Sequence, residues 1–314
     1  MTSKLISGEY IAFRTFLFMG GKEIFRVEKS GSYSGFVLPL SHGSEVSEVQ
    51  CNLKRFDLSV EYLSFEGGPA TFYIHLSPKI GVDQDIFESF LHYCFSDLKL
   101  LTDQNSVITF LEQQYSKWSE FFGGSSSSKL EINRNIGLFG ELWFLLDLVK
   151  NYGPHLASSW WGPFQNHNDF EFSKGVVEIK STIVLGKNKI SVNGVNQFQD
   201  SFGRNVHLLS MTFVPDQEAF SISDLISELI SLKVPESEIT NRISRIGHFD
   251  EIVSGSAGMK LALVSGELYS VSENFPIIKS GCIPRQVSGL NYQITLDGLP
   301  FAKYVSPVEM HLFS

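Results

Sequence analysis

The sequence predicts an α/β protein of mixed α+β type, in which a mixed sheet flanked by helices follows a β-rich N-terminal region. Three observations support this expectation. Apolar and polar residues alternate early in the chain, apolar residues recur at helical spacing after residue 85, and a strand-turn-strand section lies between two later helical regions. Hydrophobic residues make up 43% of the 314 residues and charged residues 19%, which is typical of a folded globular protein and argues against a disordered one.

The first strands are predicted over residues 56–62 and 72–76, where apolar side chains occupy every second position. A Gly-Gly-Pro sequence between them predicts a turn. Helices are expected next, because apolar residues recur at intervals of three and four over residues 87–98 and again over residues 107–122.

Two glycines and four serines over residues 123–128 have the composition of a flexible connection. We therefore expect residues 123–129 to link two domains. The first is a β-rich N-terminal domain that ends in helices, residues 1–122. The second comprises residues 130–314.

The second domain opens with a helix predicted over residues 137–149, which is apolar on nearly every side and should therefore be buried. Only Glu141 and Asp147 interrupt its apolar run. Residues 169–172 and 176–183 then predict a β-hairpin joined by a Ser-Lys-Gly turn.

Further strands are predicted over residues 190–192 and 207–214, with an Asn-Gly turn signal between them. Helices are expected over residues 223–232 and 235–246. Near the end, apolar residues at 261–264 and 268–271 flank Ser265-Gly266 and predict a hairpin, and the alternation of residues 292–296 predicts a last strand.

The net charge of -9 argues against a protein that coats nucleic acid through bulk electrostatics. It does not exclude a nuclease, because a catalytic cleft rich in carboxylates is itself negative. Local cations can still contact phosphate groups, although a solvated lysine face is an equally good interpretation. Besides Lys180, the candidates for DNA binding are Lys174, Lys187, Lys189 and Arg204.

The three cysteines lie far apart without C-x-x-C spacing, so we expect buried thiols and no zinc site or disulfide framework. No stretch approaches the roughly 18 apolar residues of a membrane span, and the N-terminus lacks the pattern of a signal peptide. We therefore expect a cytoplasmic protein without a membrane contact.

The most informative residues are three acids and a lysine: Glu141, Asp169, Glu178 and Lys180. Glu178 and Lys180 are two apart on a predicted strand and therefore share one face. A hairpin would bring Asp169 close to them. Glu141 is unusual in an apolar helix, because a buried carboxylate is costly unless a cation offsets it.

This combination of oxygen ligands and a lysine is typical of metal-dependent phosphodiester hydrolysis. We expect Asp169, Glu178 and the carbonyl group of Ile179 to bind Mg²⁺ or Mn²⁺, with Glu141 as a direct or water-mediated ligand. Lys180 would orient or deprotonate the attacking water and stabilise the charge that develops on the phosphorus centre. The simpler alternative is a surface Glu-Lys pair with unrelated acids, since E-x-K alone is common.

The segments Asn168–Phe172 and Val177–Thr182, together with Glu141, resemble the PD-(D/E)XK nuclease superfamily. Asn168 stands where the superfamily's proline would be, a position at which many members have lost it. A narrower resemblance, to the bacterial "PD-(D/E)XK motif protein" family, covers most of the chain. It is carried by Gly137–Leu142, Trp161-Gly162-Pro163, Trp118 and Phe275-Pro276, besides the acidic motif and Gln197.

The resemblance implies a restriction-endonuclease-like core with a C-terminal α/β extension, and DNA as substrate. Members tend to be encoded beside restriction-modification and phage-defence genes, so it also implies defence-system partners. Gln197 would match a glutamine that supports the active-site lysine or a phosphate, and Gln199 is close enough to be confused with it.

Two alternative functions stay open at this point. The chain could be a DNA-binding or assembly subunit with a nuclease fold and no cleavage activity, or a repair nuclease with the same chemistry. Double-strand cleavage would suggest a homodimer or a partner complex. His167 is a further catalytic candidate, and Trp160 and Trp161 either stack on a base or anchor a loop in the core.

Overall fold

The computed structural model divides the chain into two compact units, Met1–Ser127 and Ser128–Ser314. Six residues of the predicted linker, 123–128, lie outside the part that the structure describes, so the linker stays a prediction. The described residues are 5–7, 9–41, 51, 53–65, 69–122, 129–162, 168–186, 189–194, 197–198, 203–246, 259–284, 287 and 289–306.

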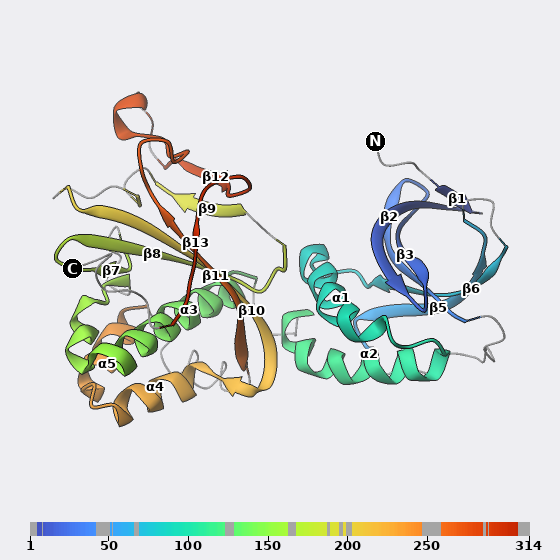
Figure 1. Cartoon of the computed structure of the whole chain (residues 1–314), viewed down its shortest axis with the longest axis horizontal. Coiled ribbons are helices and arrows are strands. Elements are labelled where there is room, and N and C mark those ends of the chain that lie inside the picture. Colours follow the sequence, from blue (N-terminus) through green and yellow to red (C-terminus); the bar gives the residue numbers. More distant parts are fainter. Residues whose placement is uncertain are drawn as a thin grey trace. The chain divides into compact units, whose positions relative to one another are not determined.

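The first unit contains a six-stranded antiparallel sheet in the order β1-β2-β3-β4-β6-β5, which curls around a common axis in Figure 1. Its apolar core includes Tyr10, Phe25 and Val37. The β-rich N-terminal region is therefore as predicted. The strands are β1 (Leu5–Ser7), β2 (Tyr10–Met19), β3 (Lys22–Lys29), β4 (Ser32–Pro39), β5 (Phe56–Leu63) and β6 (Thr71–Pro78).

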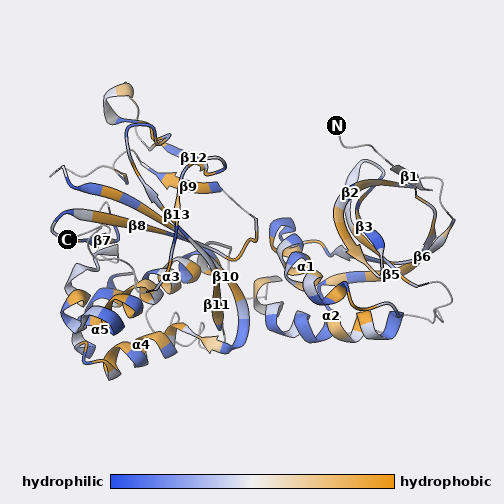
Figure 2. Ribbon diagram, viewed as in Figure 1, coloured by the Kyte–Doolittle hydropathy of each residue, from blue (hydrophilic) through white to orange (hydrophobic). Residues whose placement is uncertain are grey.

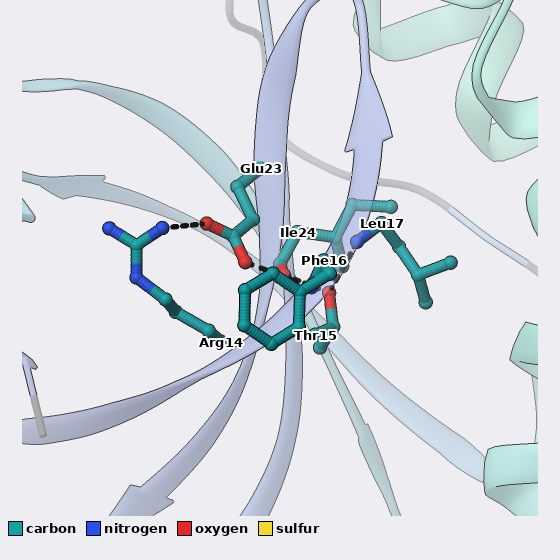
Figure 3. Close-up of polar contacts among 6 residues, drawn as sticks. All are labelled: Arg14, Thr15, Phe16, Leu17, Glu23 and Ile24. Carbon is teal, nitrogen blue, oxygen red and sulfur yellow. Dashed lines mark hydrogen bonds and ion pairs between the residues drawn. The ribbon is translucent and has the colours of Figure 1, made fainter. Parts of the chain in front are cut away.

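A bulge in β2 inserts Thr15 and Phe16 opposite β3. Phe16 has a φ of 57°, a conformation that a phenylalanine adopts only when its surroundings hold it. The Phe16 amide donates to Glu23 Oε1 at 2.9 Å, Arg14 pairs with Glu23 Oε2 at 3.1 Å, and the Thr15 hydroxyl donates to the Ile24 carbonyl (Figure 3). Because bulges increase strand twist, this one contributes to the curvature of the sheet.

Two helices follow the sheet, α1 (Gln84–Leu98) and α2 (Gln104–Trp118), and the 3₁₀ turn η1 (Ser119–Phe122) ends the described part of this unit. The carboxylates of Asp83 and Asp103 cap the first turns of the two helices. Both helices bury the apolar stripes that the sequence predicted, with Phe87, Phe90, Leu91 and Cys94 on α1 and Val107, Leu111 and Trp118 on α2.

The second unit is built on a five-stranded mixed sheet in the order β13-β11-β10-β8-β7. Strands β8 and β10 are parallel, and the other neighbours are antiparallel. This arrangement confirms the predicted mixed sheet flanked by helices. The strands are β7 (Phe170–Glu171), β8 (Gly175–Thr182), β10 (Asn205–Phe220), β11 (Leu261–Ser270) and β13 (Ala302–Lys303).

Helix α3 (Lys129–Tyr152) packs on β8 and extends the predicted helix at both ends. Its aromatic residues contact the sheet: the rings of Phe139 and Phe213 are 5.0 Å apart, and those of Phe144 and Phe170 4.9 Å. Gly140 allows the closest approach, because an added Cβ atom would lie 1.8 Å from Ser181 Oγ.

In the described part of this unit, three short 3₁₀ turns and two further helices follow α3. Hydrophobic and hydrophilic residues both appear along α4 in Figure 2, and its buried residues Ile222, Leu225 and Leu229 form one stripe. Among the described residues, no helix is long and apolar enough to cross a membrane. The elements are α4 (Ile222–Ser231), α5 (Glu236–Ile243), η2 (Pro154–Ser159), η4 (Ser244–Ile246) and η5 (Ser280–Cys282).

Strands β9 (Lys189–Asn193) and β12 (Asn291–Thr295) form a separate two-stranded antiparallel ribbon (Figure 1). The inner side of the ribbon, which includes Ile190 and Ile294, shares an apolar cluster with Leu208 of β10 and Tyr269 of β11. The ribbon is thereby packed against the main sheet.

The predicted hairpin at Ser265-Gly266 is wrong, because residues 261–270 form the single strand β11. Gly266 has another role: an added Cβ atom there would lie 2.7 Å from Cβ of Tyr304. The glycine therefore lets the C-terminal segment approach the sheet. A further strand, β13, follows the strand that was predicted to be last. The expectation of buried thiols also fails at Cys282, which is exposed.

Asp147, six residues after Glu141 in α3, is buried and holds this C-terminal segment. Its carboxylate accepts hydrogen bonds from the hydroxyl groups of Tyr304 and Ser306, and from the Asn151 side chain at 3.0 Å. Three hydrogen-bond donors thus satisfy the Asp147 carboxylate in an otherwise apolar helix, as buried polar groups require.

The contact between α3 and β8 predicts a contrast between two glycines. Gly140→Ala should lower the free energy of unfolding by roughly 1–3 kcal/mol, because the added methyl group overpacks the interface with Ser181. Gly137→Ala, one turn away, meets nothing within 4 Å and should be neutral or stabilising by up to about 1 kcal/mol. Chemical denaturation measures both, and equal stability of the two variants would contradict the packing.

Candidate active site

The candidate site begins beside β8, at the point where β7 starts. Strand β7 pairs with β8 only at Val176 and Val177, whereas β8 continues to Thr182 with β10 on its other side. From that point one edge of β8 has no paired strand among the described residues. The Ile179 amide donates to Asp169 Oδ2 at 2.7 Å. The carbonyl group of Ile179 points to the same edge, because the N–H and C=O of one strand residue lie on the same side.

Glu178 and Lys180 lie on the same face of β8, as their spacing predicts. Lys180 Nζ is 2.8 Å from Glu178 Oε1. The Gln197 side chain donates a hydrogen bond to the same oxygen at 2.5 Å and accepts one from the backbone N–H of Asn193 at 2.9 Å. Gln197 therefore connects the end of β9 to the acidic cluster.

Glu141 reaches the same place from α3. The indole N–H of Trp160 donates to Glu141 Oε2 at 2.7 Å, and this ring is completely buried. Base stacking by Trp160 is thereby excluded, and the indole instead orients the Glu141 carboxylate. The neighbouring Trp161 is 37% exposed, and its ring lies 5.8 Å from the Arg242 guanidinium carbon.

Gly162 leaves space for two of the carboxylates, because it has no side chain. The amides of Trp161 and Gly162 both donate to the Asp169 carbonyl, at 2.7 and 3.0 Å. An added Cβ atom at Gly162 would lie 2.2 Å from Glu141 Oε2 and 3.0 Å from Asp169 Oδ1. Both oxygens are thus close to one point, and a side chain there would occupy the space between them.

These groups border a cavity of about 420 Å³. Its wall on α3 is formed by Asn133, Gly137 and Glu141, which are four residues apart and therefore share one helix face. The remaining lining residues are Asp169, Glu178, Ile179, Lys180, Ser181, Thr182, Lys189, Ile190, Ser191, Asn193, Gln197 and Ser210.

The electrostatics of the cavity disfavour three negative charges. Burial, together with the neighbouring Asp169, raises the pKa of Glu178 to about 8. Burial also raises the pKa of Asp169 to about 6, although the Ile179 amide and Lys180 act in the opposite direction. The pKa of Glu141 is raised well above its usual value by burial and by Asp169. Lys180 alone does not neutralise the cluster.

The residues fit a divalent cation, because buried carboxylates and a backbone carbonyl group are the ligands that Mg²⁺ and Mn²⁺ prefer. In their present rotamers, no three acidic, histidine or cysteine side chains of the described chain converge closely enough to hold an ion. The Trp160 indole bonds one oxygen of Glu141, and the Ile179 amide bonds one oxygen of Asp169. Lys180 and Gln197 both contact the same oxygen of Glu178. None of these bonds engages the second oxygen of Glu141, Asp169 or Glu178.

Only some of the cationic residues predicted to bind DNA are found at the cavity. Lys189 is exposed and lines the cavity. Lys174 is exposed in the turn before β8 but does not line the cavity, and Arg204 is paired with Glu171 at 3.2 Å. The candidates Lys187, His167 and Gln199 lie outside the described residues.

The sequence reasoning missed the supporting residues of the site. Trp160 was considered only for stacking or loop anchoring, and Gly162 only as part of a motif. Asn133 and Gly137 could have been found from their four-residue spacing before Glu141, which places all three on one helix face. No comparable signal in the sequence points to Ser210.

Comparison with known proteins gives one family match. The family model described as "Putative PD-(D/E)XK family member, (DUF4420)" matches residues 26–297. No curated protein and no solved structure matches the chain.

The raised pKa values predict a characteristic pH dependence of stability. In the folded protein, Glu178 and Asp169 keep their protons up to about pH 8 and 6, whereas their ordinary pKa values are 4.5 and 3.8. The folded state thus binds more protons, and the metal-free protein should lose on the order of a few kcal/mol as the pH rises through this window. Mn²⁺ should restore more stability at pH 8 than at pH 5, because it replaces the lost protons.

Thermal melting of chelator-treated protein at several pH values measures this effect. Glu178→Gln should flatten the dependence, whereas Glu218→Gln, at an exposed position of β10, should leave it unchanged. A melting temperature that rises between pH 5 and pH 8 in the metal-free protein would contradict the expected burial of the carboxylates.

Proposed function

Because the chain belongs to the PD-(D/E)XK family whose model matches it, in agreement with the resemblance seen in the sequence, we propose that it is a metal-dependent DNA endonuclease. One observation carries the proposal. A single cavity brings together Glu141, Asp169, Glu178 and Lys180, which come from a helix, a short connection and a strand. These are the groups that phosphodiester hydrolysis requires.

The roles of the residues follow from their positions. Asp169, Glu178 and the Ile179 carbonyl group would hold Mg²⁺ or Mn²⁺, with Glu141 as an additional ligand. The bound cation would lower the pKa of a water molecule and neutralise charge on the phosphate. Lys180 lies on the face of Glu178, where its ammonium group can orient the attacking water and attract a phosphate oxygen.

Two residues keep the acids in place. Gln197 fixes Glu178 through one oxygen, and Trp160 fixes Glu141 in the same way. Such partners commonly restrict the orientation of metal ligands and so increase affinity for the ion. Gly137 contributes by its lack of a side chain, because open space above it lets a nucleic-acid backbone approach Glu141.

DNA is the proposed substrate, with Lys189 at the cavity as a phosphate contact. We place the activity in restriction or phage defence, in a cytoplasmic setting with defence-system partners, on the basis of family membership. A homodimer or a partner complex would supply a second site for cutting the opposite strand. The plating efficiency of phages on cells with and without the gene tests the defence role.

A non-cleaving DNA-binding or assembly subunit is the second candidate. It is favoured by the pairing of Glu178 with both Lys180 and Gln197, which satisfies this acid without a metal. Calorimetry with Mn²⁺ and cleavage assays on several forms of DNA separate the two candidates. Metal binding without cleavage of any DNA, alone or with partners, would support the subunit.

Two substitutions test cleavage directly. Glu178→Gln and Lys180→Ala should each reduce Mg²⁺-dependent cleavage of duplex DNA at least about 100-fold, because each removes a charged group that acts on the transition state. Lys279→Ala, at an exposed position that does not line the cavity, should cleave normally. Circular dichroism confirms folding, and intact cleavage by both site variants would refute the proposed function.

Trp160→Phe tests the orientation of Glu141. The substitution keeps a buried ring but removes the N–H donor, so the affinity for Mn²⁺ should fall roughly 10-fold or more. Trp161→Phe is the matched control, because that ring is partly exposed and lies beside Arg242. Isothermal titration calorimetry measures both, and equal affinities of the two variants would show that the indole has no such role.

A further inference from the structure

The ribbon formed by β9 and β12 has one apolar face and one polar face. Both strands alternate in burial, and every residue of the polar face is exposed. The register places three pairs directly opposite one another on that face. The pairs are Lys189 with Thr295, Ser191 with Gln293, and Asn193 with Asn291.

The chemistry of this face is unusual for a solvent-exposed ribbon. It carries amide and hydroxyl groups and a single lysine, and it has no acid, although the chain as a whole has a net charge of -9. Among the described residues, none of the six side chains is engaged in a hydrogen bond or an ion pair. Asparagine and glutamine can form two hydrogen bonds with adenine, and serine, threonine and lysine also bind base edges.

The polar face continues into the candidate active site. Lys189, Ser191 and Asn193 all line the cavity that contains Glu178. The Gln197 side chain links the Asn193 backbone to Glu178, because it hydrogen-bonds both of them. A group bound on the ribbon would therefore be held at a fixed position relative to the acids.

The dimensions of the ribbon suit duplex DNA. The polar face spans four residue steps, about 13 Å at 3.3 Å per residue, which corresponds to roughly four base-pair steps. The major groove admits a two-stranded ribbon, whose outward side chains then face the base edges.

We propose that the polar face of the β9–β12 ribbon reads the base edges of duplex DNA in the major groove beside the cleaved phosphate. The inference rests on the proposed function and specifies its substrate as duplex DNA with a preferred sequence. Asn291 and Gln293 are specificity-determining residues that can be changed without altering the cavity, since neither lines it. Lys189 at the cavity end contacts a phosphate or a guanine.

A pool of duplexes with a randomised segment tests the proposal. Wild-type protein cuts the pool in Mg²⁺, and sequencing of the cut ends gives the base preference at each position. The double variant Asn291→Ala/Gln293→Ala should lose roughly 10- to 100-fold of the discrimination at one or two base pairs. Gln293→Glu should change the preferred base at its position from adenine to cytosine, because a carboxylate only accepts hydrogen bonds.

The matched control is Gln217→Ala/Asn241→Ala, which removes the same residue types at exposed positions away from the cavity. It should cut with the wild-type preference. All variants should keep the wild-type melting temperature and affinity for Mn²⁺. A wild-type protein without any base preference, or ribbon variants with an unchanged preference, would overturn the inference and leave the proposed function intact.

If the protein is not a nuclease, the wild-type protein cuts none of the duplexes in the pool. A wild-type protein that cuts nothing is then used to select duplexes from the same pool by binding in Ca²⁺, and the retained sequences are compared among the variants. A base preference that the ribbon variants alter would support the ribbon while cleavage is refuted. Retained sequences that are identical for wild type and ribbon variants would refute the ribbon as well.

Discussion

The second unit depends on one constraint, which is that three carboxylates, one buried and two half-buried, lie around Lys180 in one cavity. Burying like charges costs free energy unless protons, hydrogen bonds or a cation offset the cost. The chain supplies hydrogen bonds from the Trp160 indole, the Ile179 amide and Gln197. These bonds orient the acids but leave their pKa values raised. The site thus retains a favourable energy of binding for a positive ion.

The main sheet creates the place where this is possible. Because β7 starts only at Phe170, opposite Val177, the edge of β8 at Ile179 has no paired strand there, and its amide bonds the Asp169 side chain instead. Helix α3 approaches β8 closely at Gly140, which brings Glu141 to the same edge. A longer β7 would pair with the Ile179 backbone and displace Asp169. The shortness of a strand therefore matters as much as the identity of the acids.

Local patterns in the sequence were sufficient for helices α1 to α5, for strands β5 to β10 and for the acidic cluster, because each depends on spacing within a few residues. Glu178 and Lys180 share a strand face for that reason. Local patterns did not single out strands β1 to β4, which precede residue 56. The error at Ser265-Gly266 arose because a glycine needed for close contact with Tyr304 looks the same as a glycine needed for a turn. The bond between Trp160 and Glu141 and the pairing of β9 with β12 join residues far apart in the chain. Spacing carries no information about such contacts.

Gln197 has a thermodynamic consequence, since one side chain bonds both the Glu178 carboxylate and the Asn193 backbone. In the proposed nuclease, a ligand that shifted β9 would also shift Gln197 and change the affinity of Glu178 for an ion. Linkage makes the effect reciprocal, so the ion changes the affinity for that ligand by the same factor. The effect of the metal ion on the affinity for a DNA sequence, and the effect of that sequence on the affinity for the metal ion, would then measure the same coupling free energy.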